Sequence, residues 1–387
     1  MVIYLASFTI CIAISFIIDR KDSKSFGYIT GSLVIIAILS LVAGLRANSV
    51  GTDTSDYPLS LYNLACASDS FGTFYSESWF RFWQWVDVRS FEIGYLILVW
   101  IARCLGSFQV LLFLTSALTV GPIYYAFVKK RYDICLPICL ILFLLIDFNW
   151  TLNAMRQWIA AAFVFLGVFA LYEPGSGLLH QFKCVVAIFI AYLFHTSAII
   201  GIGVLLIRVA LINEKGFTRY CLITVGSILL LLFVGTVQSI LSSIGLSKFA
   251  VYLGDGSVHF AVRGFVLQLP FFLLSIYYYK SRRASDKLAL FYLCMMTVSL
   301  IASQIASLGL YSGRITLYID IFEIPLVGSI VSNISKKVHV TARLPLLSQS
   351  VSSLFIYLFS FAYGLLYWFS VYATGSGETL PYFFFWQ

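Results

Sequence analysis

Charged residues are scarce in this chain of 387 residues. Asp, Glu, Lys and Arg together make up 11% of the sequence, well below the roughly 25% that is typical of soluble domains. Hydrophobic residues supply 60%, and the mean hydropathy is +0.93. This composition excludes a soluble globular domain. The net charge of +8 comes from Lys and Arg in short segments between apolar runs, where such residues usually set membrane orientation. We therefore expect no nucleic-acid partner.

The sequence also lacks the short motifs of common catalytic and metal sites. It contains no P-loop, no G-x-S-x-G, no H-E-x-x-H and no C-x-x-C. Of the eight Cys, Cys135 and Cys139 stand four apart on one helix face. With no His nearby and no second pair, packed thiols are expected there rather than a metal site. We expect no metal and no cofactor.

Long apolar runs are what the sequence has in abundance. Many reach the ~18 residues that cross a hydrocarbon core. They are solid rather than alternating, which argues against an outer-membrane barrel. We predict an all-α polytopic membrane bundle of about 10–12 spans, forming one integral-membrane domain over residues 1–387. The predicted spans are Val2–Ile18, Tyr28–Leu45, Phe91–Leu105, Phe108–Phe127, Ile134–Trp150, Trp158–Tyr172, Cys184–Leu206, Tyr220–Ile244, Gly264–Tyr279, Leu288–Leu308, Ile315–Ile330 and Leu347–Tyr372.

Basic loops predict the orientation of these spans. The first run lacks a basic n-region and a small-residue cleavage site, so we expect a start-transfer span rather than a signal peptide. The loop Arg20–Lys24 is basic and should face the cytoplasm. The loop 46–90 then lies outside. Counting back from the other end places the loops around Arg282 and Lys337 inside and the tail Gly375–Gln387 outside.

The middle of the chain conflicts with this frame. Strict alternation places the basic segment Lys129–Arg131 outside, against the positive-inside tendency. One solution is that some runs between Phe91 and Leu206 enter the membrane and return, because irregular backbone is tolerated where it lines a wet cavity. The run Cys184–Leu206, with His195 in its middle, is one candidate.

The outer loop 46–90 contains an aromatic segment. Ser76, Trp79, Phe80, Trp83 and Val86 follow helical spacing, which predicts a short amphipathic helix lying at the membrane surface. Trp and Tyr favour that depth. Stacking of these rings on a sugar is the alternative interpretation.

Ionisable residues beside or within the apolar runs are candidates for function, because burying them in a membrane is costly. They are Arg46, Asp53, Asp56, Glu92, Arg156, His195, Arg263 and Arg314. Four arginines suggest an anionic ligand, since a guanidinium binds phosphate through a planar fork. Structural roles stay open: Arg46 could snorkel, Asp53 could cap a turn, and Glu92 could favour a helix N-terminus. His195 could bond across helices. Arg156 is harder to explain this way, because no acid lies near it in sequence.

Several motifs occur in a characteristic order along the chain. They are L-R-A-N-S-V-G-T-D-T-S-D-Y at Leu45–Tyr57, E-I-G-Y at Glu92–Tyr95, N-A-M-R-Q-W-I-A at Asn153–Ala160, F-H-T-S-A-I-I at Phe194–Ile200, G-R-I-T-L-Y at Gly313–Tyr318 and L-P-Y at Leu380–Tyr382. With them the chain resembles the EpsG-like family of bacterial polysaccharide polymerases, the Wzy-type enzymes. Each motif alone is weak, but their order and spacing cover most of the chain.

The resemblance implies a multi-pass enzyme of the bacterial inner membrane with a fold similar to C-type glycosyltransferases and an outward cavity. Such enzymes transfer a growing glycan from undecaprenyl pyrophosphate onto a new lipid-linked repeat unit. The implied partners are undecaprenyl-pyrophosphate-linked oligosaccharide, membrane lipid and a chain-length regulator protein. Carried over by motif, substrate binding falls to Arg46, Arg156, Arg314, Glu92, Gln157 and Tyr318. Asp53 is the first candidate for the catalytic base and His195 the second, because the acceptor hydroxyl must lose a proton.

Two other classes stay open. An O-antigen ligase, or another lipid-linked sugar transferase, would use similar chemistry with a different acceptor. A lipid-linked oligosaccharide flippase or other transporter is the alternative from outside the enzymes. Transporters commonly show paired repeats with broken spans at corresponding positions, and the sequence shows no such pairing.

Overall fold

A computed structural model describes residues 1–19, 21–22, 25–81, 83–173, 178–212, 215–245, 260–282, 286–304, 312–340, 346–372 and 374–387. Three residues of the loop Arg20–Lys24 lie outside the described residues, namely Arg20, Ser23 and Lys24. The chain divides into two compact units. The first comprises Met1–Tyr172, Leu178–Ala198 and Val331–Gln387, and the second comprises Glu173–Gly177 and Ile199–Ile330.

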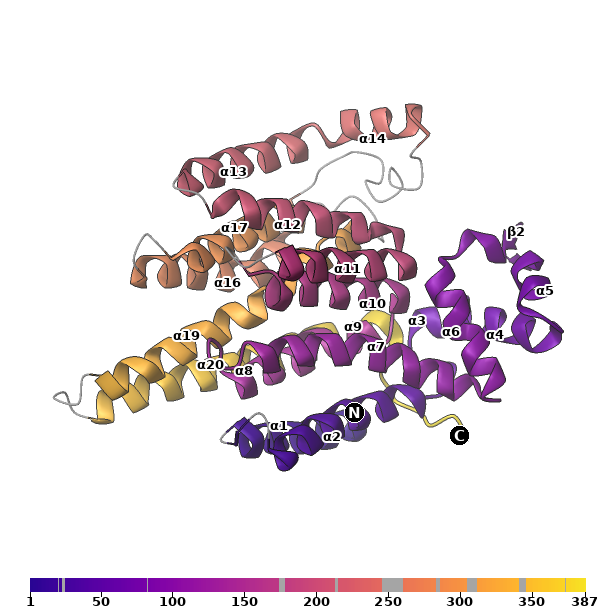
Figure 1. Ribbon diagram of the computed structural model, residues 1–387, viewed down its shortest axis with the longest axis horizontal. Helices are drawn as coiled ribbons and strands as arrows, with labels where there is room; N and C mark the ends of the chain where they lie inside the picture. The colour runs from indigo at the N-terminus through magenta and orange to yellow at the C-terminus, as the bar shows by residue number, and fades with distance from the viewer. Residues whose placement is uncertain are drawn as a thin grey trace. The chain divides into compact units, whose positions relative to one another are not determined.

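The first unit consists of long helices with a group of short elements at one end (Figure 1). Its long helices are α1 (Val2–Asp19), α2 (Phe26–Gly44), α7 (Phe108–Lys129), α8 (Leu136–Leu142) with α9 (Phe148–Thr151), α10 (Met155–Phe165), α11 (Leu178–Phe194) and α20 (Leu346–Val371). Its short elements are α3 (Thr52–Asp56), α4 (Pro58–Ala67), α5 (Phe71–Ser76), β1 (Ser78–Arg81), β2 (Gln84–Asp87) and α6 (Ile93–Cys104).

The long helices of the first unit pack side by side. Helix α1 packs against α2 and α8, α2 against α7, and α10 against both α7 and α11. Segments of π-helix, Phe143–Asp147 and Leu166–Leu171, continue α8 into α9 and extend α10. Gly44 allows α2 to approach α7 closely, because a Cβ there would lie 2.9 Å from the Cβ of Phe113. The core between these helices is apolar, as expected for a bundle whose outer surface faces lipid.

The second unit is also helical. Its helices are α12 (Ile199–Leu211), α13 (Gly216–Leu232), α14 (Val234–Ser243), α16 (Val262–Ser281), α17 (Lys287–Ala302) and α18 (Leu317–Asp320), and α19 (Glu323–Val340) runs from it into the first unit. Helix α17 packs against α13 and α16. Its N-terminus is capped by Asp286, which accepts bonds from the backbone N of Leu288 and Ala289 at 3.1 Å each.

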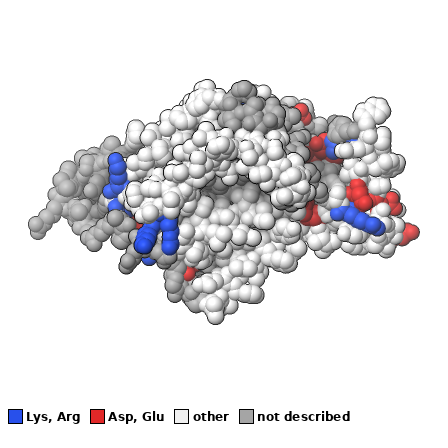
Figure 2. Space-filling model, turned by 90° about the horizontal axis from the view of Figure 1, so that it is seen from above, with Lys and Arg blue, Asp and Glu red and all other residues white. Residues whose placement is uncertain are grey.

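The prediction of an all-α polytopic membrane protein is confirmed. Among the described residues, six helices are long and apolar enough to cross a membrane, or seven if the pair α13 and α14, bent by 77°, counts as one span. Six further apolar helices have 10–17 residues. The length criterion thus gives fewer spans than the 10–12 expected. Most of the face shown in Figure 2 carries neither acidic nor basic side chains, in keeping with the low charged fraction.

Contacts within the first unit identify its two ends. At one end Arg131 Nη1 donates to the backbone O of Lys21 at 2.9 Å, so the segment after α7 adjoins the first basic loop. At the other end the backbone N of Ala47 donates to the O of Phe383 at 2.9 Å, which joins the outer loop to the tail. By the positive-inside rule we expect the Lys21 end to face the cytoplasm, and we call the other end the outer end.

The topology conflict in the middle of the chain disappears because α6 does not cross. Its 12 residues span ~18 Å at 1.5 Å per residue, well short of a ~30 Å hydrocarbon core. Helix α7 begins beside the end of α2, since a Cβ on Gly44 would lie 3.2 Å from the backbone O of Gln109. Both ends of α6 therefore belong to the outer end, and Lys129–Arg131 falls inside. The run Cys184–Leu206 is also interrupted, because α11 ends at Phe194 and α12 begins at Ile199.

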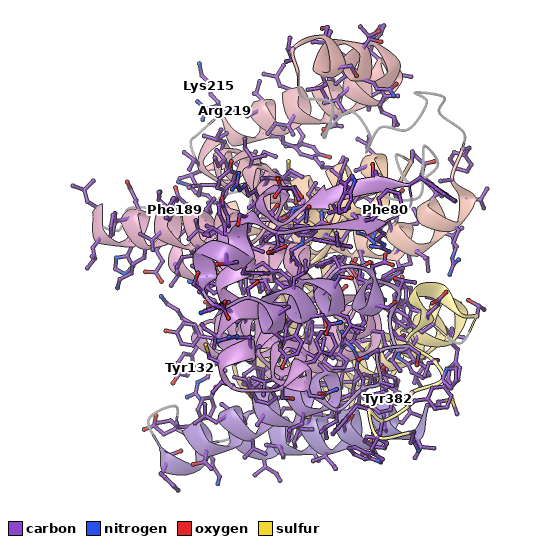
Figure 3. All side chains as sticks on the ribbon, turned by 90° about the vertical axis from the view of Figure 1, so that its right-hand side faces the viewer. Phe80, Tyr132, Phe189, Lys215, Arg219 and Tyr382 are labelled. Carbon is purple, nitrogen blue, oxygen red and sulfur yellow. The ribbon has the colours of Figure 1, made fainter. Side chains whose placement is uncertain are left out.

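The predicted amphipathic helix over residues 76–86 is wrong. Helix α5 ends at Ser76, and β1 and β2 form an antiparallel hairpin in which Trp79 pairs with Val86 and Phe80 with Trp85. Alternate aromatic residues satisfy a strand as well as a helix, and cross-strand aromatic pairs favour the hairpin. The hairpin places large aromatic rings at the surface. Trp83 is 93% exposed, and Phe80, which lies in β1, is labelled in Figure 3.

Candidate functional site

The predicted site residues of the first unit gather at its outer end. Three segments that are far apart in the sequence meet there: the start of α6, the start of α10 and the turn after α11. Five polar residues from these segments are joined by hydrogen bonds or an ion pair, and we call them the outer-end cluster: Glu92, Arg156, Gln157, His195 and Ser197.

Arg156, in the first turn of α10, is held on several sides. Its guanidinium lies over the rings of Tyr57 and Phe91, with its carbon 4.7 Å and 4.6 Å from the ring centroids. Its Nη1 forms an ion pair with Glu92 Oε2. No acid lies near Arg156 in the sequence, and the partner that the structure brings to it precedes it by 64 residues. The two rings pack against each other, with centroids 5.6 Å apart, so the guanidinium packs against both rings rather than between them, and this contact restricts its orientation.

Glu92 links two segments of the cluster. Its Oε2 contacts Arg156, and its Oε1 accepts a hydrogen bond from the backbone N of Thr196 at 3.1 Å. Burial alone would raise the pKa of Glu92, but the charges of Arg156 and His195 outweigh burial and hold that pKa below its ordinary value. Glu92 is therefore a carboxylate at neutral pH.

His195 lies in the turn after α11 and is oriented through one ring nitrogen. Its Nδ1 lies 2.6 Å from Ser197 Oγ and accepts a bond from the Ser197 backbone N at 3.1 Å. Gln157 Nε2 donates to the same Ser197 Oγ at 3.3 Å. Because the backbone N–H makes Nδ1 an acceptor, the neutral ring carries its proton on Nε2. Ser197 thus connects His195 to α10.

Asp53 supports the cluster from the outer loop. It lies in α3 with 6% of its surface exposed. Its Oδ2 accepts a hydrogen bond from the backbone N of Ala154 at 2.7 Å. Ala154 precedes α10 in the left-handed conformation, φ 43° and ψ 36°, a region that non-glycine residues rarely adopt. Asp53 therefore stabilises the strained turn that presents Arg156.

Arg46 is buried against the same turn, with 1% of its surface exposed. Its Nη2 donates to the backbone O of Leu152 at 3.1 Å and to Thr54 Oγ1 at 3.2 Å. Burial lowers the pKa of Arg46 to about 10, so it stays charged at neutral pH. These contacts fasten the end of α2 to the α9–α10 turn, and a role in gripping pyrophosphate stays a prediction.

The C-terminal tail closes the other side of this turn. Asn153 Nδ2 donates to the backbone O of Gly377 at 2.9 Å, and the backbone N of Gly51 donates to the O of Glu378 at 2.8 Å. Tyr382, labelled in Figure 3, donates through its hydroxyl to the O of Val42 at 2.8 Å. The L-P-Y motif therefore anchors the tail to α2.

Arg314 and Tyr318 belong to the second unit. Arg314 is part-buried in the 3₁₀ turn Ser312–Ile315, and Tyr318, in α18, is fully buried. Their participation in the site stays a prediction. Among the described residues, no group of three or more His, Cys, Asp or Glu side chains could hold a metal ion.

Sequence reasoning missed four contributors to the first-unit site. They are Tyr57, Phe91, Thr196 and Ser197. Tyr57, Thr196 and Ser197 lie within motifs that were recognised, and Phe91 immediately precedes one. The motifs were therefore a usable signal, but most candidates were chosen for their charge, which aromatic rings and backbone groups do not carry.

A comparison with known protein families supports the resemblance that these motifs indicated. The model of the EpsG family matches residues 29–384, nearly the whole chain. No curated protein and no solved structure matches the sequence.

Proposed function

Because the chain belongs to the EpsG family, we propose that it polymerises polysaccharide repeat units carried on a polyprenyl pyrophosphate. Family membership gives it a polysaccharide polymerase-like role and a glycosyltransferase-like activity in general. The finer proposal is that a growing glycan is transferred from undecaprenyl pyrophosphate onto a lipid-linked repeat unit. The reaction takes place at the outer face of the bacterial inner membrane.

The Arg156 guanidinium is the observation that carries this proposal. Its Nη1 is paired with Glu92, and its buried Nε has no hydrogen-bond partner among the described residues. An unpaired buried donor costs about 1–3 kcal/mol, and more when it is charged. An incoming pyrophosphate oxygen would satisfy this donor. The family role and this unsatisfied Nε donor together favour a pyrophosphate-linked donor.

The chemistry of the leaving group needs a fixed cation. As the bond between the anomeric carbon and the phosphate oxygen breaks, negative charge develops on the pyrophosphate. A guanidinium that already packs against Tyr57 and Phe91 is positioned to stabilise this charge. We place the donor pyrophosphate at Arg156.

Deletion of the gene tests the proposal directly. A strain that lacks the protein should accumulate single repeat units on undecaprenyl pyrophosphate at the outer face of the membrane. These units can be extracted and given to the purified wild-type protein, which should join them into longer chains. Arg156→Ala should not. The matched control is Arg89→Ala, because Arg89 is an exposed outer-end arginine that lies over Tyr75. Units that accumulate at the inner face, and are not joined in vitro, would indicate a flippase instead.

A further inference from the structure

We propose that Glu92 is the general base of the transfer reaction and that donor binding to Arg156 releases it for this role. The inference rests on the proposed function, because it requires a pyrophosphate at Arg156. It assigns Glu92 a catalytic role in place of the substrate-binding role expected from the motif.

Each of the other two candidate bases already accepts a backbone hydrogen bond in the folded protein. Asp53 Oδ2 accepts the Ala154 backbone N–H at 2.7 Å, and Asp53 is 6% exposed. His195 accepts through Nδ1 from Ser197, so the neutral ring carries a proton on Nε2. An Nε2–H can donate to a substrate oxygen but cannot remove a proton from it.

Glu92 is the carboxylate whose pairing changes when the donor binds. Before binding, Oε2 pairs with Arg156 Nη1. A pyrophosphate carries more negative charge than a carboxylate and matches the guanidinium fork, so it competes with Glu92 for Arg156. Glu92 would keep its second contact, in which Oε1 accepts from the Thr196 backbone N at 3.1 Å. The released Oε2 therefore stays in place beside the leaving group rather than swinging away.

The proposed step is balanced. The acceptor hydroxyl of the incoming repeat unit gives its proton to Glu92 Oε2, and its oxygen forms a bond to the anomeric carbon of the donor glycan. The bond between that carbon and the phosphate oxygen breaks, and the electron pair leaves with the lipid pyrophosphate, which Arg156 stabilises. Glu92 then returns its proton to water when the product leaves.

The release of Glu92 from Arg156 when the donor binds has a consequence for the pH dependence of the rate. Titratable groups facing Glu92 are Arg156 from α10 and His195 from the turn after α11, with Tyr57 packed against Arg156. In the free enzyme Arg156, together with His195 when its ring is protonated, lowers the Glu92 pKa. Bound pyrophosphate adds negative charge and offsets Arg156, which raises that pKa. Since kcat/KM reports the free enzyme and kcat the complex, the acid limb of kcat should lie at higher pH than that of kcat/KM.

Glu92→Gln tests the proposal, with Asp69→Asn as the matched control because Asp69 is an exposed carboxylate of the same outer loop. Transfer is measured with lipid-linked repeat units extracted from the deletion strain, and binding with undecaprenyl pyrophosphate in detergent. We expect Glu92→Gln to transfer ~10²–10⁴-fold more slowly and to lose the acid limb of the pH profile. It should bind undecaprenyl pyrophosphate as tightly as wild type or more tightly, because its competitor for Arg156 is gone. Asp69→Asn should behave as wild type.

Three results would overturn the inference. Transfer by Glu92→Gln within about threefold of wild type would remove the base role while the proposed function stands. Loss of pyrophosphate binding in parallel with transfer would make Glu92 a positioning residue. A wild-type protein that neither binds nor transfers would overturn the proposed function and this inference together. Glu92→Asp covers a folding defect in the Gln variant: it keeps a carboxylate and should retain the acid limb at a lower rate.

Discussion

At the residue scale, the most informative contact is the one between Asp53 and Ala154. A non-glycine residue in the left-handed region costs about 1–2 kcal/mol, and Ala154 adopts it two residues before Arg156. Strain of this kind persists where surrounding contacts enforce it, and it tends to occur at functional sites. Here Asp53 bonds the Ala154 N–H from one side, while Asn153 is held by Thr52 and Gly377. The turn is therefore fixed by its neighbours rather than by its own sequence.

Two substitutions of Asp53 distinguish a structural role, in which it supports the α9–α10 turn, from a catalytic role as the base. Asp53→Ala leaves the Ala154 N–H buried without its acceptor, so the protein should lose about 1–3 kcal/mol of stability. Asp53→Asn keeps an oxygen acceptor and should be nearly as stable as wild type. Thermal unfolding of the purified protein measures both. If Asp53 is instead the base, as the motif suggested, Asp53→Asn should be stable and yet transfer ~10²–10⁴-fold more slowly.

Arg156→Lys should not restore function. Lys keeps the positive charge, but it binds phosphate as a point charge and loses both the planar fork and the stacking on Tyr57 and Phe91. We expect normal protein levels and polymer output close to that of Arg156→Ala, measured by gel analysis of the polysaccharide. Full-length polymer from the Lys variant would show that charge alone suffices, and full-length polymer from the Ala variant would exclude Arg156 from donor binding.

At the scale of elements, hydropathy located α1, α2 and α7 within a few residues, but it merged α11 and α12 into one run. It also gave the wrong element for residues 76–86. The long helices consist mostly of apolar residues. In a membrane such a run must satisfy its backbone hydrogen bonds internally, and a helix does so. The segment Ser78–Asp87 is short, and its alternating aromatic residues fit both periods. Its pairing depends on contacts that sequence spacing does not reveal, such as the ion pair between Arg81 and Asp56.

The sequence predicted which residues belong to the site, but not which of them pair. Order of motifs selected Arg156, Glu92, Gln157 and His195, and the structure brings all four together. The pairing of Glu92 with Arg156 could not be foreseen, because 64 residues separate them and only the packing of α6 against α11, and of α11 against α10, closes that distance. The motifs identified residues of the cluster, and tertiary packing determined which of them pair with one another.

The structural role of the C-terminal tail can be tested by removing one hydroxyl group, that of Thr379. Thr379 is fully buried and accepts through Oγ1 from Asn149 Nδ2 at 2.9 Å. Thr379→Val keeps the shape but leaves that amide donor unpaired, so stability should fall by about 1–3 kcal/mol. Thr374→Val is the control, because Thr374 is exposed and bonds only its own helix at Ser370 and Val371. Equal thermal stability of the two variants would contradict a structural role for the tail.

At the scale of the whole molecule, the short helix α6 decides the topology of the first unit. If α6 crossed the membrane, the turn after Cys104 would be cytoplasmic and the basic segment Lys129–Arg131 would be translocated. With α6 confined to the outer end, each basic segment of the first unit that the structure describes falls on the cytoplasmic side. The outer loop, the α9–α10 turn, the turn after α11 and the tail then share the outer side, as their contacts require.

Thiol labelling in whole cells tests this arrangement. Cys66, Cys104 and Cys221 are the exposed cysteines among the described residues, so a protein with Cys66 and Cys221 changed to Ser reports chiefly on Cys104. We expect a membrane-impermeant maleimide to label Cys104 in intact cells, because α6 spans only ~18 Å and both of its ends lie outside. The cytoplasmic counterpart is Tyr132→Cys in a background that also lacks Cys104. Tyr132 is 67% exposed and follows Arg131 at the Lys21 end, so it should react only after permeabilisation. Labelling of Cys104 only in permeabilised cells would mean that α6 crosses, and the outer-end cluster would then need another explanation.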